Sequence, residues 1–215
     1  MGYIIATASQ KGGVGKSTLC RMIAREAAIN GLTGKIADFD VRQSTTKRWT
    51  ERRMQNGIQP TVRAETFLSV SEALKDATDF DVFILDGAPQ ASKQTKEMAC
   101  VADLLIIPTG DSFEDREPAV ELANDLYSNG ISPAKVAFAL CRVGDSKTQL
   151  AEARAYLGKT QYTVLDGEMP ERDSFKTLLR NGLAPTESPF KSLRERSALM
   201  AQNAIDVLVS ASQTR

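Results

Sequence analysis

The sequence predicts an α/β fold with a mostly parallel central sheet and helices on both of its faces. Two observations predict it: short, almost continuously apolar runs, and helical patterns that alternate with these runs from end to end. Strands that are apolar throughout are typical of parallel sheets covered on both faces. The 215 residues suit one domain with a sizeable core, and no repeat or convincing linker divides them. We therefore expect a single domain over residues 1–215.

The apolar runs give the expected strands in chain order. They are Tyr3–Ala8, Lys35–Phe39, Asp81–Leu85, Leu104–Ile107 and Val136–Leu140. The expected helices are Ser17–Asn30, Thr46–Met54, Leu68–Ala77, Glu117–Tyr127, Gln149–Leu157, Ser174–Leu179 and Arg194–Val209. The first helix is expected to stop at Gly31, because glycine commonly ends helices. Ligands of such folds bind at the carboxyl ends of the strands, so functional residues are expected there.

Composition excludes several classes of function. Basic and acidic residues each total 27, so attraction to DNA or to an anionic membrane must come from a local patch. Histidine is absent, which excludes a His-based triad and His-ligated metal sites. The three cysteines, Cys20, Cys100 and Cys141, are scattered, which argues against a disulfide scaffold and suggests a reducing cytoplasm. We expect no signal peptide, and no apolar run approaches the roughly 20 residues of a membrane helix.

The most specific motif is the glycine-rich loop of residues 12–17, which follows the first expected strand and opens the first expected helix. In such a loop successive backbone N–H groups curl round phosphate oxygens, and the helix N-terminus adds a favourable dipole. Lys16 is expected to reach the β- and γ-phosphates, and the Ser17 hydroxyl to ligate Mg²⁺. A flexible glycine turn is the alternative. The agreement of glycines, lysine, hydroxyl and context favours a P-loop NTPase that uses ATP and Mg²⁺.

Three acidic residues follow apolar strands. Asp38 and Asp40 end the second expected strand, and alternation places both on one side of it. Two carboxylates there suit Mg²⁺ hydration and orientation of an attacking water. The alternative is that both acids only cap a helix or stabilise a turn. Asp86 follows another strand, which is the Walker B arrangement for holding Mg²⁺, usually through water. The expected metal site therefore comprises Ser17, Asp38, Asp40 and Asp86.

Lys11 opens the stretch KGGVGKST, which resembles the deviant Walker A motif of the ParA/MinD ATPases. The resemblance spans most of the chain and is greatest to small plasmid-type ParA proteins. It implies that Lys11 reaches the partner's nucleotide in an ATP-bound homodimer and stabilises charge on the transferred phosphoryl group. Gly12 would let the two loops approach closely; a solvated loop lysine is the alternative. The expected nucleotide contacts in the loop are Lys11, Gly12, Gly13, Val14, Gly15, Lys16, Ser17 and Thr18.

The family's D-x-D element also matches. By that match Asp40 positions the nucleophilic water and Asp38 assists the metal shell, so the expected catalytic residues are Lys11, Lys16 and Asp40. The family usually continues with Pro-Gln, whereas this chain has Val41-Arg42-Gln43. Trp49, with Arg52 and Arg53 after it, resembles the W…R pattern of the plasmid-type proteins.

Three further segments resemble family elements. Gly87-Ala88-Pro89 matches the small residues and proline that follow the Walker B acid. Pro108, Ser112 and Asp115 resemble a P-x-x-P-S-x-x-D element near the nucleotide, with Asp111 in place of its second proline. Cys141-Arg142-Val143 stands where the family often has Asn-Arg-Val at the base. Because Cys141 lacks the donor and acceptor of an amide, we expect Arg142, backbone or neighbouring groups to contact the nucleotide there.

Two basic clusters are candidate DNA contacts. The first is Arg42, Lys47, Arg48, Arg52 and Arg53, and the second is Arg172, Lys176, Arg180, Lys191, Arg194 and Arg196. The spacing of Arg172, Lys176 and Arg180 predicts one helix face. The resemblance implies salt-sensitive, non-specific DNA binding by the ATP dimer through basic C-terminal residues. Ordinary solvated helix faces, diluted by acids, are the alternative.

The resemblance implies a partition ATPase in the cytoplasm, associated with the nucleoid. A ParB-like or cargo-adaptor protein would stimulate hydrolysis, and the cargo would be a plasmid or a protein assembly such as a carboxysome. No N-terminal extension precedes the first strand, so we do not expect a helix-turn-helix domain or sequence-specific operator binding.

Three alternatives stay open. A MinD-like membrane cycle is disfavoured because residues 198–212 contain no lysine or arginine before Arg215, and a membrane anchor needs a basic amphipathic face. We expect that helix to pack on the sheet and no membrane partner. An electron carrier like the nitrogenase iron protein needs two cysteines in glycine-rich loops, whereas Cys100 and Cys141 are expected in the core. A regulatory module that binds ATP without turnover is the third.

Overall fold

The computed structural model describes residues 2–88 and 92–212, so Pro89 and Arg215 lie outside the described part of the chain. The strands are β1 (Tyr3–Thr7), β2 (Gly34–Asp38), β3 (Arg63–Thr66), β4 (Val82–Asp86), β5 (Leu104–Thr109), β6 (Val136–Val143), β7 (Thr163–Val164) and β8 (Met169–Pro170). The α-helices are α1 (Lys16–Ile29), α2 (Thr45–Gln55), α3 (Val70–Ala73), α4 (Ser92–Val101), α5 (Phe113–Ser128), α6 (Lys147–Leu157), α7 (Asp173–Arg180) and α8 (Lys191–Ser212). Three 3-10 helices, η1 (Ala77–Asp79), η2 (Pro133–Lys135) and η3 (Pro185–Glu187), connect them.

The described strands form one sheet in the order β3-β2-β4-β1-β5-β6-β7, with β8 paired to β6, and every pairing is parallel. The first strand lies between β4 and β5, and Thr7 at its end is opposite Asp86. The loop after β1 therefore leaves the middle of the sheet at its carboxyl edge, where doubly wound folds bind ligands. The expected α/β class with a parallel sheet is confirmed.

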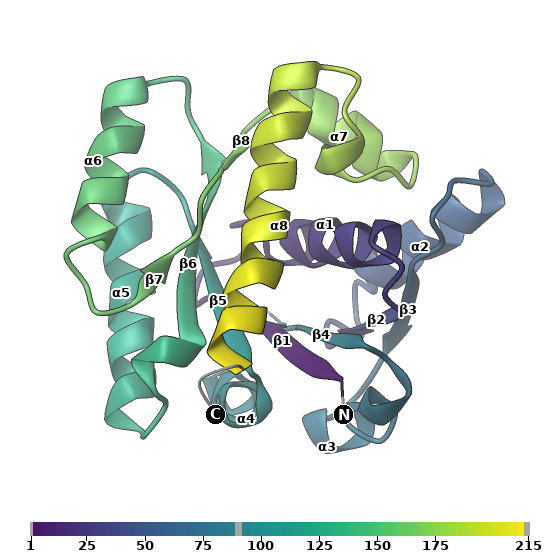
Figure 1. Cartoon of the computed structure of the whole chain (residues 1–215), viewed down its shortest axis with the longest axis horizontal. Helices are drawn as coiled ribbons and strands as arrows, with labels where there is room; N and C mark the ends of the chain where they lie inside the picture. Colours follow the sequence, from purple (N-terminus) through teal and green to yellow (C-terminus); the bar gives the residue numbers. More distant parts are fainter. Residues whose placement is uncertain (1, 89–91, 213–215) are drawn as a thin grey trace.

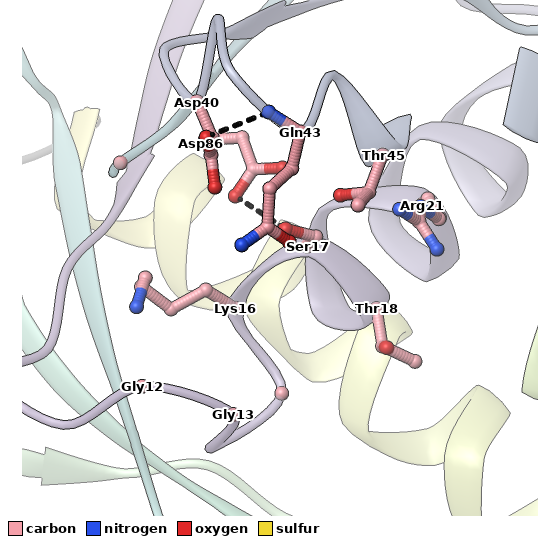
Figure 2. A pocket seen from close by; sticks show the side chains of 12 residues that line it. Gly12, Gly13, Lys16, Ser17, Thr18, Arg21, Asp40, Gln43, Thr45 and Asp86 are labelled. Atoms are coloured by element: carbon pink, nitrogen blue, oxygen red, sulfur yellow. Dashed lines mark hydrogen bonds between the residues drawn. The ribbon is translucent and has the colours of Figure 1, made fainter. Parts of the chain in front are cut away.

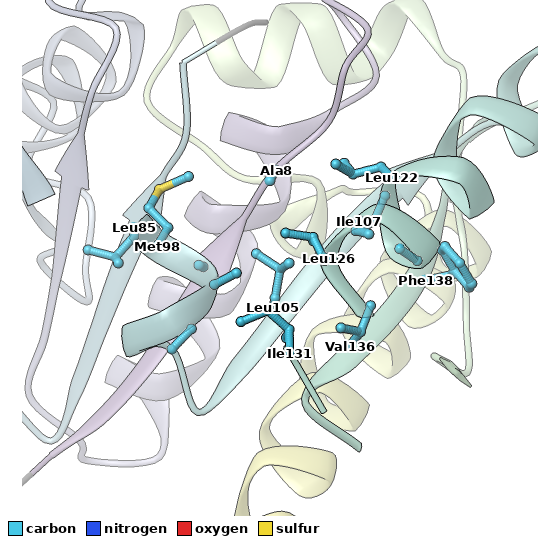
Figure 3. Close-up of a cluster of buried hydrophobic side chains, with 14 of the residues drawn as sticks. Ala8, Leu85, Met98, Leu105, Ile107, Leu122, Leu126, Ile131, Val136 and Phe138 are labelled. Atoms are coloured by element: carbon cyan, nitrogen blue, oxygen red, sulfur yellow. The ribbon is translucent and has the colours of Figure 1, made fainter. Parts of the chain in front are cut away.

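Helices cover both faces of the sheet (Figure 1). Alternate strand residues enter opposite cores: Ile4 and Ala6 pack with α3 to α6, whereas Ile5 packs with α1, α2, α7 and α8. Figure 3 shows the first core, where Leu105 and Phe138 of the strands lie near Leu126 of α5. Both faces of the strands are thus buried, which explains why the strands are apolar throughout.

Several elements differ from the expectations. Strand β3 was not predicted, because it pairs only with β2 at the edge of the sheet and alternates exposed with half-buried residues. Helix α4 and the two-residue strands β7 and β8 were also not predicted. The expected helix over 68–77 is wrong in length: α3 spans four residues, capped where the Ser69 hydroxyl accepts from the Glu72 N–H at 3.2 Å.

Helix α5 begins four residues before the expected Glu117, with Ser112 at its N-cap. The earlier start places Pro118 inside the helix, although the sequence pattern placed it in the first turn. Proline has no N–H to donate to the carbonyl four residues before it, which here belongs to Glu114. The Glu114 carbonyl is therefore available to a partner outside the helix.

The cysteines only partly follow their expected placement. Cys20 in α1 and Cys141 in β6 are buried, and burial raises the pKa of the Cys141 thiol to about 12. Cys100 is exposed, so its expected core position is wrong. It belongs to α4, in which Met98 and Ala99 are buried, and the next residue faces outward. The apolar neighbours of Cys100 in the sequence could not show which side of α4 it lies on, because α4 itself was not predicted.

The last helix, α8, crosses over α1 and packs against it on the second face of the sheet (Figure 1). Met200, Ala201 and Ala204 are buried there, as expected for a helix that packs on the sheet. Within residues 2–88 and 92–212, no helix is both long enough and apolar enough to cross a membrane.

Candidate functional site

The loop between β1 and α1 has the backbone geometry of a phosphate cradle. Gly13 and Gly15 have φ angles of 74° and 105°, in the left-handed region that favours glycine. Gly15 is the N-cap of α1, no side chain caps the helix, and its first turn has no acidic residue. The first N–H groups of α1 therefore have no side-chain acceptor, and they suit an anion. The Val14 side chain is buried, so Val14 can contact a phosphate only through its backbone.

A cavity of about 390 Å³ lies above this loop. Its walls are Gly12, Gly13, Gly15, Lys16, Ser17, Thr18, Arg21, Asp40, Gln43, Thr45, Asp86 and Gly87. Figure 2 shows Ser17, Asp40 and Asp86 close together on one side of the loop. The structure thus brings together most of the residues expected from the two acidic motifs and the glycine loop.

Asp86 ends β4 and is held from two helices. The Ser17 hydroxyl donates to its Oδ1 at 3.1 Å, and the Thr46 hydroxyl donates to its Oδ2 at 2.8 Å. The Asp86 residue is only 2 % exposed. Burial, with the nearby Asp38 carboxylate adding to it, raises the pKa of Asp86 to about 6. A positive charge placed beside this carboxylate would lower that pKa again.

The two acids after β2 have different positions. Asp38 is 1 % exposed and is not among the described residues that line the cavity. Its Oδ1 accepts from the Asp40 N–H and its Oδ2 from the Thr46 N–H, both at 3.0 Å, while burial raises its pKa. Asp40 is half-buried, lines the cavity and accepts from the Gln43 N–H at 3.1 Å. Only the second acid of the pair therefore faces the cavity directly.

Lys16 lies at the start of α1 with its side chain largely buried in the cavity wall. Its ammonium donates to the backbone carbonyl of Lys11 at 3.4 Å, a long hydrogen bond. Burial lowers the pKa of Lys16, against the opposing effect of Asp86. A cation held this loosely in a cavity suits an anionic ligand.

Lys11 is directed toward α5 of its own chain. Its ammonium is 2.9 Å from Oδ1 of Asp115 and also donates to the Glu114 carbonyl, the one that Pro118 leaves without a helix partner. The Lys11 side chain is 40 % exposed. The lysine thus has a partner within the single chain, and enough exposure to exchange that partner.

Sequence reasoning missed four side chains of the site: Arg21, Gln43, Thr45 and Thr46. Arg21 is four residues after Ser17 on α1, so helix periodicity alone places both on one face. Thr45 and Thr46 open α2, immediately after the loop that contains Asp40. No named motif includes these positions, and only the packing of α2 against α1 brings them together.

A second, smaller cavity of about 120 Å³ lies beside the loop and shares Gly13, Gly15 and Thr18 with the first. Met169, Phe175 and Leu179 give it an apolar wall. Arg142 also lines it; its Nη1 donates to the Gly13 carbonyl at 2.8 Å and its Nη2 pairs with Glu171 at 2.5 Å. Arg142 therefore contacts the loop itself, while buried Cys141 lies behind Gly15.

The oxygen donors fit Mg²⁺ held beside a phosphate. In the described part of the chain, no three His, Cys, Asp or Glu side chains are grouped to hold a metal ion. Mg²⁺ in nucleotide sites is held by one or two carboxylates, substrate phosphates and water. The pairing of the Ser17 hydroxyl with Asp86, and Asp40 in the same cavity, supplies that donor set.

The two basic clusters separate into exposed and paired residues. In the first, Arg42, Lys47 and Arg48 are exposed, whereas Arg53 is 1 % exposed and pairs with Glu187 at 2.6 Å. In the second, Arg172, Lys176, Lys191 and Arg196 form ion pairs with Asp145, Asp173, Glu195 and Glu168, respectively. Arg180, at the end of α7, is also exposed, so both clusters present exposed basic side chains.

Comparisons with known proteins place the chain among nucleotide-binding domains. Residues 5–185 match the family model described as the CobQ/CobB/MinD/ParA nucleotide binding domain. By sequence, no curated protein matches the chain.

Solved structures match it over nearly the whole length. MinD from Pyrococcus horikoshii OT3, complexed with Mg-ADP, has a TM-score of 0.76 at 14% identity, covering 98% of this chain and 99% of that one. A Borrelia burgdorferi B31 protein described as a plasmid partition protein, bound to AMPPNP, has 0.70 at 17% identity, covering 98% and 99%. The ATP complex of Cyanothece McdA(D38A) has 0.67 at 14%, covering 95% and 96%. At these identities the structures show the shared fold.

Proposed function

The chain belongs to the family of CobQ/CobB/MinD/ParA nucleotide-binding domains, and from that premise we propose that it is a Mg²⁺-dependent ATPase of the ParA type. One observation supports this most directly: the glycine loop, Lys16, Ser17, Asp40 and Asp86 line a single cavity. These are the parts that phosphoryl transfer needs, namely a phosphate cradle, a cation, metal-side oxygens and a carboxylate for the nucleophile. The Mg-ADP, ATP and AMPPNP in the similar structures support the choice of nucleotide.

In this proposal the residues of the cavity have distinct roles. The N–H groups of the loop bind the phosphates, and Lys16 neutralises charge on the β- and γ-phosphates. Ser17 and Asp86 would hold Mg²⁺, which would supply positive charge to neutralise the charge that develops on the phosphates. Asp40, the acid that faces the cavity, orients the attacking water, while Asp38 supports the metal side indirectly through its backbone contacts.

The adenine base would occupy the second cavity. That cavity shares three loop residues with the phosphate cavity, and its Met169 and Phe175 wall suits a flat apolar ring. Arg142, fixed by Gly13 and Glu171, would border the base or the ribose. The replacement of the family's asparagine by Cys141 is consistent with recognition by shape and backbone groups.

ATP would also drive formation of a homodimer in which Lys11 reaches the partner's nucleotide. Two features support this role. The lysine is not needed to close the phosphate cavity of its own chain, because Lys16 already lines it. Its side chain is exposed enough to leave Asp115. In the dimer Lys11 would stabilise charge on the transferred phosphoryl group as an arginine finger does.

The ATP dimer would bind nucleoid DNA non-specifically, and a ParB-like or cargo-adaptor protein would stimulate hydrolysis and release it. The exposed Arg42, Lys47 and Arg48 near the cavity support DNA binding, since phosphate contacts need unpaired basic side chains. The description of one similar structure as a plasmid partition protein supports partition as the role. The cargo would be a plasmid or a protein assembly.

Hydrolysis is tested with purified protein, ATP and Mg²⁺, with and without non-specific DNA. The wild-type chain should release phosphate, and Asp40→Ala should abolish release while retaining ATP binding. Lys11→Ala should also bind ATP and lose dimer-dependent hydrolysis. Hydrolysis by Lys11→Ala at the wild-type rate would contradict the role in trans, and no hydrolysis by any preparation would favour a regulatory ATP-binding module.

Partner choice is tested by comparing DNA with anionic vesicles. ATP-dependent binding to a DNA fragment of arbitrary sequence, weakening steeply between 50 and 200 mM salt, is expected. Binding to phosphatidylglycerol vesicles with no binding to DNA would instead favour a MinD-like membrane cycle.

A further inference from the structure

Thr46 has no role in any motif of the sequence, yet it connects both buried carboxylates of the site. It is fully buried at the start of α2. Its hydroxyl donates to Asp86 Oδ2 at 2.8 Å, and its backbone N–H donates to Asp38 Oδ2 at 3.0 Å. One residue of α2 thus holds an oxygen of the acid that ends β2 and an oxygen of the acid that ends β4.

Arg21 determines which way the Thr46 hydroxyl points. Its Nε and Nη2 lie 3.3 and 3.2 Å from Thr46 Oγ1. A guanidinium can only donate, and a hydroxyl has one proton and two lone pairs. Both lone pairs of Thr46 are therefore occupied by Arg21, and its proton is committed to Asp86. Every hydrogen-bonding position of this hydroxyl is used.

Packing against Trp49 holds Arg21 in place. Arg21 is 6 % exposed and its guanidinium carbon lies 5.7 Å from the ring centroid of Trp49. Arg53 lies 5.4 Å from the same ring, and the indole N–H donates to the Leu183 carbonyl at 3.1 Å. The side chains that fix Thr46 are thus themselves fixed by packing and hydrogen bonds, as supporting residues of a metal site are.

We propose that Thr46 is a positioning residue of the Mg²⁺–nucleotide site, which fixes the Asp86 carboxylate while Arg21 fixes the Thr46 hydroxyl. This inference rests on the proposed function. In the structure Ser17 and Thr46 each hold one oxygen of Asp86. When the Ser17 hydroxyl is used as a ligand, Thr46 is the remaining side chain that holds Asp86. Its loss should weaken the response to Mg²⁺ and leave phosphate binding by the loop unchanged.

The test is equilibrium binding of a fluorescent N-methylanthraniloyl ADP, titrated with Mg²⁺. Thr46→Val removes the hydroxyl at nearly constant shape and should raise the Mg²⁺ concentration at half-response by about tenfold or more, a typical effect for supporting residues. Thr46→Ser should restore the wild-type midpoint. Binding without Mg²⁺ should be the same in Thr46→Val, Thr46→Ser and the wild type.

Thr50→Val is the matched control, because Thr50 is also a buried threonine of α2, and its hydroxyl donates at 2.7 Å to the Lys47 carbonyl. Its Mg²⁺ midpoint should equal that of the wild type. Should Thr46→Val fail to fold, as judged by thermal unfolding, Arg21→Met tests the same link through the direction of the hydroxyl and should also raise the midpoint.

The outcomes separate the two proposals. A midpoint within twofold of the wild type in folded Thr46→Val, or in Arg21→Met when Thr46→Val does not fold, would overturn the inference. Absence of any Mg²⁺-dependent ADP binding by the wild-type chain would instead overturn the proposed function.

Discussion

The ammonium of Lys11 lies 2.9 Å from Oδ1 of Asp115 in the same chain. The Glu114 carbonyl, which lacks a helix donor because of Pro118, accepts a second hydrogen bond from it. Both side chains of the ion pair are partly exposed, so the pair is worth at most about 1 kcal/mol. A lysine in this position must leave α5 before it can reach a partner's nucleotide. The ion pair therefore opposes the proposed dimer weakly.

Breaking this ion pair should favour the dimer. Asp115→Asn, combined with Asp40→Ala to prevent hydrolysis, should lower the concentration for half-dimerisation at saturating ATP by about four- to 25-fold, because each dimer breaks two of these ion pairs at up to about 1 kcal/mol each. Sedimentation velocity measures it. Glu117→Gln is the control, because it removes the same charge from an exposed position of α5. Unchanged or weaker dimerisation of Asp115→Asn would contradict the expectation.

Burial of Asp86 should make the nucleotide-free chain less stable at higher pH. Its pKa in the folded chain is about 6, above the ordinary 3.8, so the folded state binds the proton more tightly than the unfolded state. The resulting stabilisation is fully present below about pH 4 and is lost as pH rises through 6. By pH 8 the loss should reach about 3 kcal/mol. Urea unfolding between pH 4 and 8 measures it.

Asp86→Asn separates this effect from other titrating groups. The variant has no carboxyl to ionise, so the free energy of unfolding should fall less with pH and should exceed that of the wild type at pH 8. Adding Mg²⁺ to the ADP complex should further stabilise the wild type and not the variant, since Asp86 is expected to hold the metal. If the free energy of unfolding changes with pH equally in the two proteins, the pKa of Asp86 is the same in the folded and unfolded states, which would contradict the expectation.

Substitution of Arg53 should lower the free energy of unfolding, whereas substitution of Arg48 should leave it nearly unchanged, although both residues belong to the same basic cluster. Arg53 is buried and bonds Glu187 and three backbone carbonyls, of Gln59, Pro60 and Gly182. Arg53→Met leaves Glu187 without this partner and should lower the free energy of unfolding by about 3–5 kcal/mol. Arg48→Met, at an exposed position, should change it by less than about 0.5 kcal/mol.

Arg48 is instead expected to contribute to DNA binding. With ATP, Arg48→Met should weaken binding to a non-specific fragment and reduce the salt slope by about one, the amount for one phosphate contact. Fluorescence anisotropy at several salt concentrations measures both. A salt slope equal to that of the wild type would exclude Arg48 as a phosphate contact.

The glycine loop and the parallel sheet could be predicted because their signals are local. Gly12 to Ser17 need only the order of residues after a strand, and buried strands such as 82–86 are apolar on both faces. The edge strand β3 and helix α4 could not be predicted, because their polar residues face water and their apolar residues have no clear period. Cys100 was misplaced for the same reason.

The supporting residues of the site could not be predicted either. Thr46 and Arg21 are 25 positions apart in sequence, and their contact depends on how α2 packs against α1. Likewise, the spacing of Asp38 and Asp40 predicts that both acids lie on one side of the strand. In the structure Asp38 is buried and accepts a hydrogen bond from the Asp40 N–H, and only Asp40 faces the cavity. Motif spacing identifies the acids, whereas tertiary packing decides which acid faces the ligand.

Alanine substitutions at Gly12 and Gly15 should separate nucleotide binding by the single chain from dimerisation. A Cβ on Gly15 would lie 2.9 Å from Met169 Cε at a φ of 105°, so Gly15→Ala should distort the loop and weaken ADP binding by about tenfold or more. A Cβ on Gly12 would meet nothing within 4 Å. Gly12→Ala should therefore bind ADP like the wild type, yet fail to dimerise with ATP if the two loops approach closely. Sedimentation with ATP decides it, and normal dimerisation of Gly12→Ala would show that the partner chain does not approach this position.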